Sequence, residues 1–229
     1  RMKTIELSPG EYRELKAVLE DLEHADRHRV VFPVPLEEDP DADVVYLENR
    51  ARHELDDGRN WTSTRTVRKK VLTYAGKKEH AELKIHFNPV WEDVELEYAR
   101  VISPSGEVRE IRENETNLMD AGWVASAPRY PAGRILVASL PGVAPGSVIE
   151  YRVVRRTRNH PFFHLRAYLR NFNPMVHGAV EIDAPQGLDV AAGLEGGEGV
   201  ATSRTEENGR VTRRWEARRV RGLKRESDL

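Results

Sequence analysis

The alternation of apolar and polar residues along much of the chain constrains its fold more than any other feature of the sequence. In residues 81–87 (AELKIHF) every second residue is apolar, and the residues between them are charged or histidine. Successive side chains of a β-strand point to opposite faces of the sheet, so this pattern predicts a strand with one buried face and one face in water. Residues 149–153 and 176–182 alternate in the same way. We therefore expect these three segments to form sheet, with one face wet.

The alternation changes phase once within a single predicted strand. Val94, Leu96 and Tyr98 are apolar at even positions, whereas Ala99 and Val101 are apolar at odd positions. One extra residue in a strand restores the buried face after such a change. We therefore predict a β-bulge near Tyr98 or Ala99.

Short turn signals separate the strand-like segments. Asp56–Gly58, Pro104–Gly106 and Asn208–Gly209 supply residues that tolerate positive φ, as tight hairpins require. Helices do not alternate with the strands, as they would in a parallel sheet. From about Val44 onward we predict a mainly β chain that forms an antiparallel two-sheet β-sandwich.

The start of the chain carries the one clear helical pattern. Ser8, Pro9 and Glu11 match an N-cap, a first-turn proline and an N3 carboxylate. The apolar residues that follow at helical spacing are Tyr12, Leu15, Val18, Leu19 and Leu22. We expect residues 1–41 to form an N-terminal α-helix and a connector rich in proline and acidic residues. Residues 42–229 would form the β-sandwich, and a further boundary near residue 160 stays open.

Composition and charge exclude several classes of protein. The 36 Lys and Arg residues nearly balance the 38 Asp and Glu residues, so the chain lacks the charge of a dedicated nucleic-acid binder. No stretch approaches the roughly 18 apolar residues of a membrane-spanning helix. The chain has no cysteine, which excludes disulfides, thiolate metal sites and cysteine nucleophiles within it. We interpret one basic cluster as a solvated strand edge and linker: Arg213, Arg214, Arg218, Arg219, Arg221, Lys224 and Arg225.

The sequence indicates no catalytic, cofactor-binding or metal-binding residues. His160 and His164 have a spacing that suits zinc on a helix, but Pro161 favours a loop and no acidic third ligand is near. The Gly-x-Ser-x-Gly motif of serine hydrolases does not occur. The glycines of 193–199 precede no Lys-Ser or Lys-Thr pair, so we interpret them as a hairpin connection rather than a phosphate-binding loop.

Aromatic residues in loop-like segments supply the one candidate interaction surface. Trp123 and Tyr130 lie in one such segment, and Phe162, Phe163 and His164 lie in another. Exposed aromatic residues on the loops of a sandwich can bind a sugar or a peptide. The same residues can instead cover the core. Sequence alone leaves both interpretations open.

Several segments together resemble a known family. Residues 140–151 (LPGVAPGSVIEY) set two Pro-Gly turns before a strand that begins at Val148. They are similar, nearly residue for residue, to the signature of a bacterial domain of unknown function found immediately N-terminal to transglutaminase-like domains. Phe87–Pro89, Ala99–Gly106 and Arg214–Ala217 agree in order and spacing. The resemblance covers roughly residues 44–229.

This resemblance implies a β-sandwich without catalytic residues or cofactor, carried by a larger bacterial protein that is often periplasmic or secreted. The chain itself does not fix the compartment. The implied partner is the adjacent transglutaminase-like domain of the same polypeptide. Our leading hypothesis is a domain for interaction with, or positioning of, that module or its substrate. Two alternatives stay open, namely a module that binds glycan or protein through loop aromatics, and an independent hydrolase.

Overall fold

The computed structural model describes residues 36, 39, 41–126 and 132–223. All of them belong to one compact unit, residues 35–229. The predicted N-terminal helix and nearly all of the connector lie outside the described residues, so the proposed division at residue 41 stays a prediction.

The described chain is mainly β, as the alternation predicts. Its strands are β1 (Val44–Leu55), β2 (Trp61–Val71), β3 (Glu82–Phe87), β4 (Glu92–Ile102), β5 (Val108–Glu110), β6 (Thr116–Asp120), β7 (Arg134–Ser139), β8 (Val148–Thr157), β9 (Met175–Pro185), β10 (Val200–Glu207) and β11 (Arg210–Val220). The other elements are the short helix α2 (Tyr74–His80) and the 3₁₀ turns η2 (Glu113–Glu115) and η3 (Val124–Ser126).

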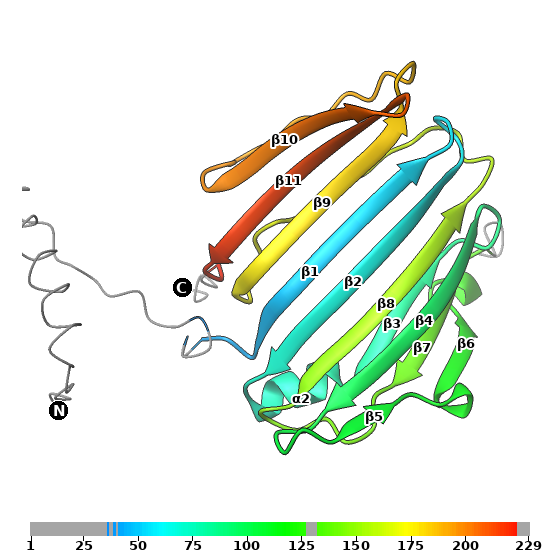
Figure 1. The fold of residues 1–229 in the computed structure, drawn as a ribbon. Helices are drawn as coiled ribbons and strands as arrows, with labels where there is room; N and C mark the ends of the chain where they lie inside the picture. The colour runs from blue at the N-terminus through cyan, green and yellow to red at the C-terminus, as the bar shows by residue number, and fades with distance from the viewer. Residues whose placement is uncertain (1–35, 37–38, 40, 127–131, 224–229) are drawn as a thin grey trace, which may run out of the picture. The chain divides into compact units, whose positions relative to one another are not determined.

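The strands form two sheets, which gives a sandwich-like arrangement (Figure 1). The large sheet has eight strands in the order β10-β11-β9-β1-β2-β8-β4-β5, and the small sheet has the order β3-β7-β6. The prediction of purely antiparallel sheets is wrong, because β1 and β9 pair in parallel. After β8 the chain returns along the sheet through residues 158–174 before β9 begins, so β9 runs in the same direction as β8 and β1. Such a parallel crossover needs a long connection, and here that connection contains no helix.

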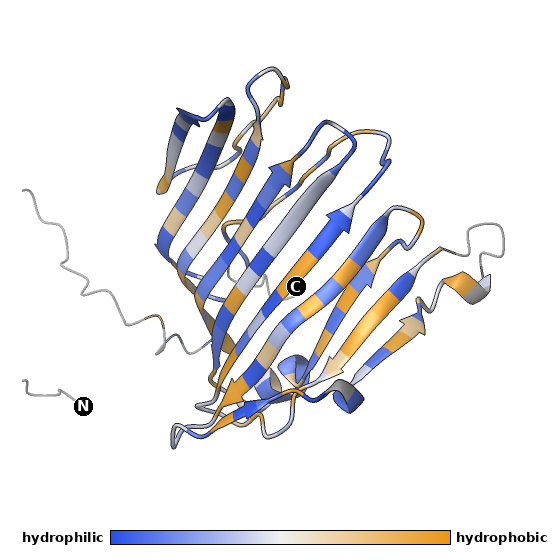
Figure 2. Ribbon diagram, turned by 45° about the vertical axis from the view of Figure 1, so that its right-hand side comes forward, coloured by the Kyte–Doolittle hydropathy of each residue, from blue (hydrophilic) through white to orange (hydrophobic). Residues whose placement is uncertain are grey.

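Most local predictions are confirmed. Strand β3 covers residues 82–87 of the alternating segment, and its apolar side is the more buried one. The predicted bulge is present, because the β4–β8 register shifts between Leu96 and Tyr98. The predicted turn at 208–209 joins β10 to β11, and Asn208 and Gly209 both have positive φ. Figure 2 shows the resulting stripes of hydrophobic and hydrophilic residues across the strands.

Two local predictions need correction. Strand β9 is not wet on one side: Ala179 and Asp183 are buried as well as Ile182, because β9 lies between β1 and β11 and their arginine side chains bind the Asp183 carboxylate. The glycine-rich segment 193–199 is not a hairpin, since β11 lies between β9 and β10 in the sheet.

Helix α2 was missed because it is short. Its N-cap is Thr73, whose hydroxyl accepts a hydrogen bond from the Gly76 amide at 3.0 Å. A Cβ on Gly76 would lie 2.2 Å from the Asp43 carbonyl oxygen, so only glycine fits there.

The small sheet packs on one face of the large sheet, which we call the inner face. The core between them contains residues of both sheets: Val44, Val71, Leu83, Ala99, Val101, Ala138, Leu140, Val143 and Ile149. A second cluster lies farther along the same face and contains Leu55, Trp61, Ile182 and Ala184. No strand covers this second cluster among the described residues.

Candidate binding groove

The part of the inner face that the small sheet leaves free is covered by chain without regular structure. One covering piece is the crossover segment, which we define as Phe162–Phe172. Its side chains alternate as in a strand: Phe163, Leu165 and Leu169 are half-buried, whereas Phe162 and His164 are exposed. The amides of residues 163–169 nevertheless donate to no backbone oxygen among the described residues. Residues 163–169 are thus strand-like in pattern, but their amides have no backbone partner among the described residues.

The second covering piece is the segment Leu188–Leu194, between β9 and β10. Leu188 and Val190 pack against the second cluster, whereas Asp189 and Leu194 are exposed. The Leu188 amide bonds the Pro185 carbonyl at 2.9 Å, and the Arg213 guanidinium donates to the Val190 carbonyl. Among the described residues, the amides of 189–194 donate to no backbone oxygen.

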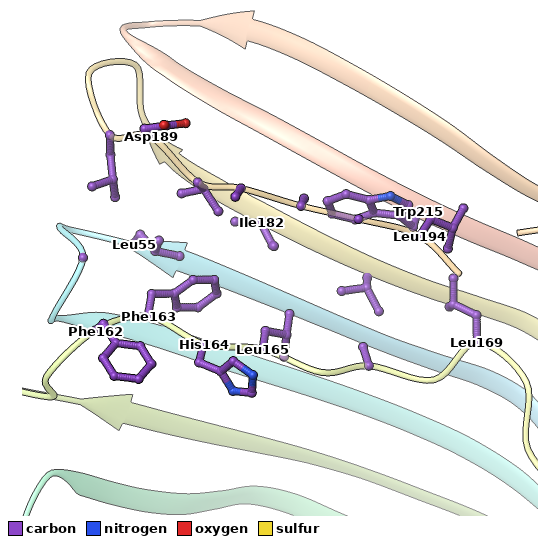
Figure 3. A pocket seen from close by; sticks show the side chains of 18 residues that line it. Leu55, Phe162, Phe163, His164, Leu165, Leu169, Ile182, Asp189, Leu194 and Trp215 are labelled. Carbon is purple, nitrogen blue, oxygen red and sulfur yellow. The ribbon is translucent and has the colours of Figure 1, made fainter. Parts of the chain in front are cut away.

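An apolar groove of about 450 Å³ lies between these two segments (Figure 3). Leu55, Ile182 and Trp215 come from β1, β9 and β11 and line it together with both covering segments. Figure 3 shows Phe163 and Leu165 pointing toward these sheet residues, whereas Phe162 and His164 point the other way. A volume of this size is typical of ligand sites in proteins.

The structure brings together three of the five residues predicted as an interaction surface. Phe162, Phe163 and His164 are consecutive and all line the groove. Trp123 is 49% exposed, but it lies in the turn that follows β6, a strand of the small sheet. It lines none of the described cavities. Tyr130 lies outside the described residues.

An aromatic cluster fixes the start of the crossover segment. The His160 ring packs edge-on against Trp61 and Trp91, with ring centroids 5.4 and 5.5 Å apart. His160 Nδ1 lies 2.7 Å from the Phe162 carbonyl oxygen, and Phe163 packs edge-on against Trp61 at 5.2 Å. His160 thus has a packing role in the structure. Among the described residues no group of three or more His, Cys, Asp or Glu side chains could hold a metal ion.

A second cavity of about 790 Å³ lies on the other side of the crossover segment, and we call it the basic chamber. Its polar side chains from β1, β2, β4 and β8 are Asn49, His53, Ser63, Arg65, Glu92, Arg155 and Thr157. The Arg155 guanidinium binds Glu92 at 2.7 Å and the His86 carbonyl at 2.8 Å.

His53 is the buried titratable group of this chamber. Its Nδ1 lies 2.8 Å from the Ser63 hydroxyl, and its Nε2 has no hydrogen-bond partner in the part of the chain that the structure describes. Burial, and to a smaller extent the positive charge of Arg155, together lower the pKa of His53 to about 4. The Thr157 hydroxyl is also buried without a partner. Each such atom costs roughly 1–3 kcal/mol.

The His53–Ser63 pair does not have the properties of a catalytic dyad. A general base needs a pKa near the working pH, and no carboxylate of a described residue orients the His53 ring. Sequence reasoning missed this pair. The predicted turn at 56–58 could have revealed it, because a hairpin centred there makes residues 53 and 63 cross-strand partners, as the register shows.

Comparisons with known proteins agree with this fold. A family described as a domain of unknown function with a solved structure, DUF3857, matches residues 57–224, and the chain belongs to this family. The resemblance read from the sequence is thereby confirmed as far as a domain of unknown function. No curated protein sequence matches the chain. No described helix is long and apolar enough to cross a membrane.

One solved structure shares the fold over most of the chain. It is a protein from Parabacteroides distasonis ATCC 8503 that is described as a candidate protease, with a TM-score of 0.75 and 20% sequence identity. The match covers 81% of this chain but only 37% of that chain. An M1 zinc metallopeptidase from Deinococcus radiodurans matches with a TM-score of 0.39 and 12% identity, over 76% of this chain and 39% of that chain. That score is too low to support an argument.

Proposed function

We propose that this chain is a non-catalytic recognition domain of a longer protein, which holds an extended segment of polypeptide for an adjacent transglutaminase-like domain. The observation that carries the proposal is the apolar groove, which lies between two segments without regular structure. Among the described residues, the amides of 163–169 and of 189–194 in these segments donate to no backbone oxygen.

A polypeptide in extended conformation suits this groove better than a compact ligand does. Its side chains alternate, so every second apolar residue can enter the groove over Leu55 and Ile182. Its backbone can bond the amides of residues 163–169, because strand addition supplies main-chain hydrogen bonds as well as side-chain pockets. The groove is also half-open, as a chain that enters and leaves it requires, with Phe162 63% exposed at its rim.

The proposed role beside a second domain draws on the resemblance and on the solved relative. The signature at 140–151 resembles a domain that precedes transglutaminase-like domains. The solved protein with the same fold is described as a candidate protease, and this chain spans 37% of it. Both are consistent with recognition of polypeptide here and chemistry in a separate domain. The His53–Ser63 pair supplies no activated nucleophile of its own.

A peptide array tests the recognition role. The chain is applied to random decapeptides, and we expect it to select peptides with apolar residues at alternate positions. Leu194→Asp places a charge on the groove without disturbing the core, since Leu194 is 45% exposed, and should abolish the selection. Leu118→Asp on β6, where the leucine is 54% exposed, is the matched control and should leave it intact. Equal effects of the two substitutions would contradict the proposal.

The adjacent domain is tested on the parent gene. We expect it to encode, beside this chain, a domain with cysteine, histidine and aspartate in transglutaminase order. A parent gene without such a domain would remove the partner from the proposal and leave only peptide recognition.

A further inference from the structure

The basic chamber has an unbalanced charge. Four arginines line it, Arg65, Arg155, Arg166 and Arg170, against one carboxylate, Glu92. Glu92 already forms an ion pair with Arg155, at 2.7 Å. The Arg65 Nε donates to the Asn49 side-chain oxygen at 3.1 Å, and Arg166 makes no ion pair with any other described residue. A cavity wall with this excess of positive charge attracts an anion.

The crossover segment adds to this charge along its whole length. From Arg158 to Val180 the chain contains no aspartate or glutamate, although acidic residues are more numerous than basic ones in the chain as a whole. His164, Arg166 and Arg170 lie at alternate positions along the crossover segment, and all three line the chamber. The large sheet's other face differs, because its arginines are paired with carboxylates there, as Arg68 is with Glu150 at 2.7 Å.

Neutral polar groups complete the chamber. The Ser63 hydroxyl is a possible donor to a bound anion, and so is the Thr157 hydroxyl once a ligand moves into the chamber, since it has no partner of its own. Burial is the main cause of the low pKa of His53, and the charge of Arg155 adds to the shift.

We infer that the basic chamber binds the carboxylate of an aspartate or glutamate side chain of the same polypeptide whose apolar residues occupy the groove. The assignment rests on the proposed recognition function. The groove and the chamber are both lined by Phe163, His164, Leu165, Ala167 and Leu169. A chain that runs along this segment in the groove can therefore extend an acidic side chain past it into the chamber. The preferred ligand is therefore an acidic segment with alternating apolar residues.

A titration with small carboxylates tests the chamber without any peptide. The probe is N-acetyl-glutamate N-methylamide, and the readout is the ring resonances of His53 and His164, with His177 on the other face as an internal reference. N-acetyl-glutamine N-methylamide is the neutral control. N-acetyl-alanine, which offers only a main-chain carboxylate, distinguishes recognition of an acidic side chain from recognition of a C-terminal carboxylate. We expect saturable shifts of His53 and His164 with the glutamate probe alone.

Matched variants locate the site. Arg65→Met on β2 and Arg166→Met on the crossover segment should each weaken binding of the glutamate probe roughly tenfold. Arg68→Met, on β2 but on the opposite face, should leave it unchanged. Equal shifts with the glutamine probe, stronger binding of N-acetyl-alanine, or full binding by Arg65→Met and Arg166→Met would each overturn the inference.

This titration fails independently of the array experiment. If the glutamate probe does not bind while the array still selects alternating peptides, the carboxylate assignment is wrong and the recognition role stands. If the array selects nothing while the probe binds as expected, the chamber stands as an anion site and the recognition role is wrong.

Discussion

The two halves of the inner face share strands β1 and β2 but are covered in different ways. The small sheet lies over one half. In the core beneath it, Val44, Val71 and Ile149 have no exposed surface, and neither has the nearby Val67. Over the other half lie the crossover segment and Leu188–Leu194, which leave two cavities and the unpaired Nε2 of His53. A cover of hydrogen-bonded strands seals its half, whereas a cover whose amides at 163–169 have no backbone partner among the described residues leaves two cavities. We therefore place stability in the first half and recognition in the second.

The largest expected effect is a cavity in the sealed half. Ile149 on β8 is fully buried between the sheets. Replacing it by alanine should lower the free energy of unfolding by about 4 kcal/mol, because the packed sheets cannot collapse onto the space. Urea unfolding followed by circular dichroism measures this loss. A loss below about 1 kcal/mol would mean that this half is not the tightly packed one.

The pH dependence of stability tests the second half. The pKa of His53 is about 4 in the folded protein and about 6.5 when unfolded, so the unfolded state binds the proton more readily. Above pH 6.5 the neutral His53 does not reduce the free energy of unfolding. As pH falls from 6.5 to 4, the free energy of unfolding decreases by about 3 kcal/mol because of this residue. His53→Gln should remove this part of the pH dependence. If the free energies of unfolding of wild type and variant changed equally from pH 7 to 4, the pKa of His53 would not be lowered in the folded protein.

A buried lysine gives the sealed half a pH dependence in the alkaline range. Lys69 is 4% exposed, its Nζ lies 3.0 Å from His80 Nδ1, and burial lowers its pKa to about 8. Between pH 8 and 10.5 Lys69 is protonated in the unfolded state but largely deprotonated in the folded state. The free energy of unfolding therefore rises as pH increases through this range. Lys69→Met should stabilise the protein by about 2 kcal/mol at pH 7, with no gain left near pH 10.5. Destabilisation at pH 7 would show that the ammonium is a net stabilising group.

The smallest effect is expected from the unpaired cover. Leu165 is only half-buried and borders a groove that already exists, so Leu165→Ala should cost about 1 kcal/mol of unfolding free energy. The same urea experiment measures it beside Ile149→Ala. A cost as large as that of Ile149→Ala would erase the difference between the two halves.

Local features of the fold could be predicted from the sequence, and long-range ones could not. Strand β3, the bulge beside Tyr98 and the turn at Asn208 follow from side-chain alternation and backbone preference within a few residues. The parallel pairing of β1 with β9 depends on where the chain returns after residue 157, which no local pattern encodes.

The candidate site shows the same limit. The alternation of residues 162–169 was present in the sequence, but nothing in it shows that this segment stays outside both sheets. Phe162, Phe163 and His164 were found because exposed aromatic residues in loops indicate binding. The arginines of the chamber were not found, because they come from β2, β8 and the crossover segment, which only the folded chain brings together.

In the proposed complex, a bound polypeptide supplies backbone partners to the amides of residues 163–169, which have none among the described residues of the free chain. Hydrogen exchange of the amides of residues 163–169 tests this arrangement most directly, in the chain alone and with a saturating decapeptide selected on the array. We predict fast exchange in the free chain, in contrast to slow exchange in β3, and at least tenfold slower exchange when the peptide is bound. Amides that are already protected in the free chain, or that stay unprotected at saturation, would contradict the account.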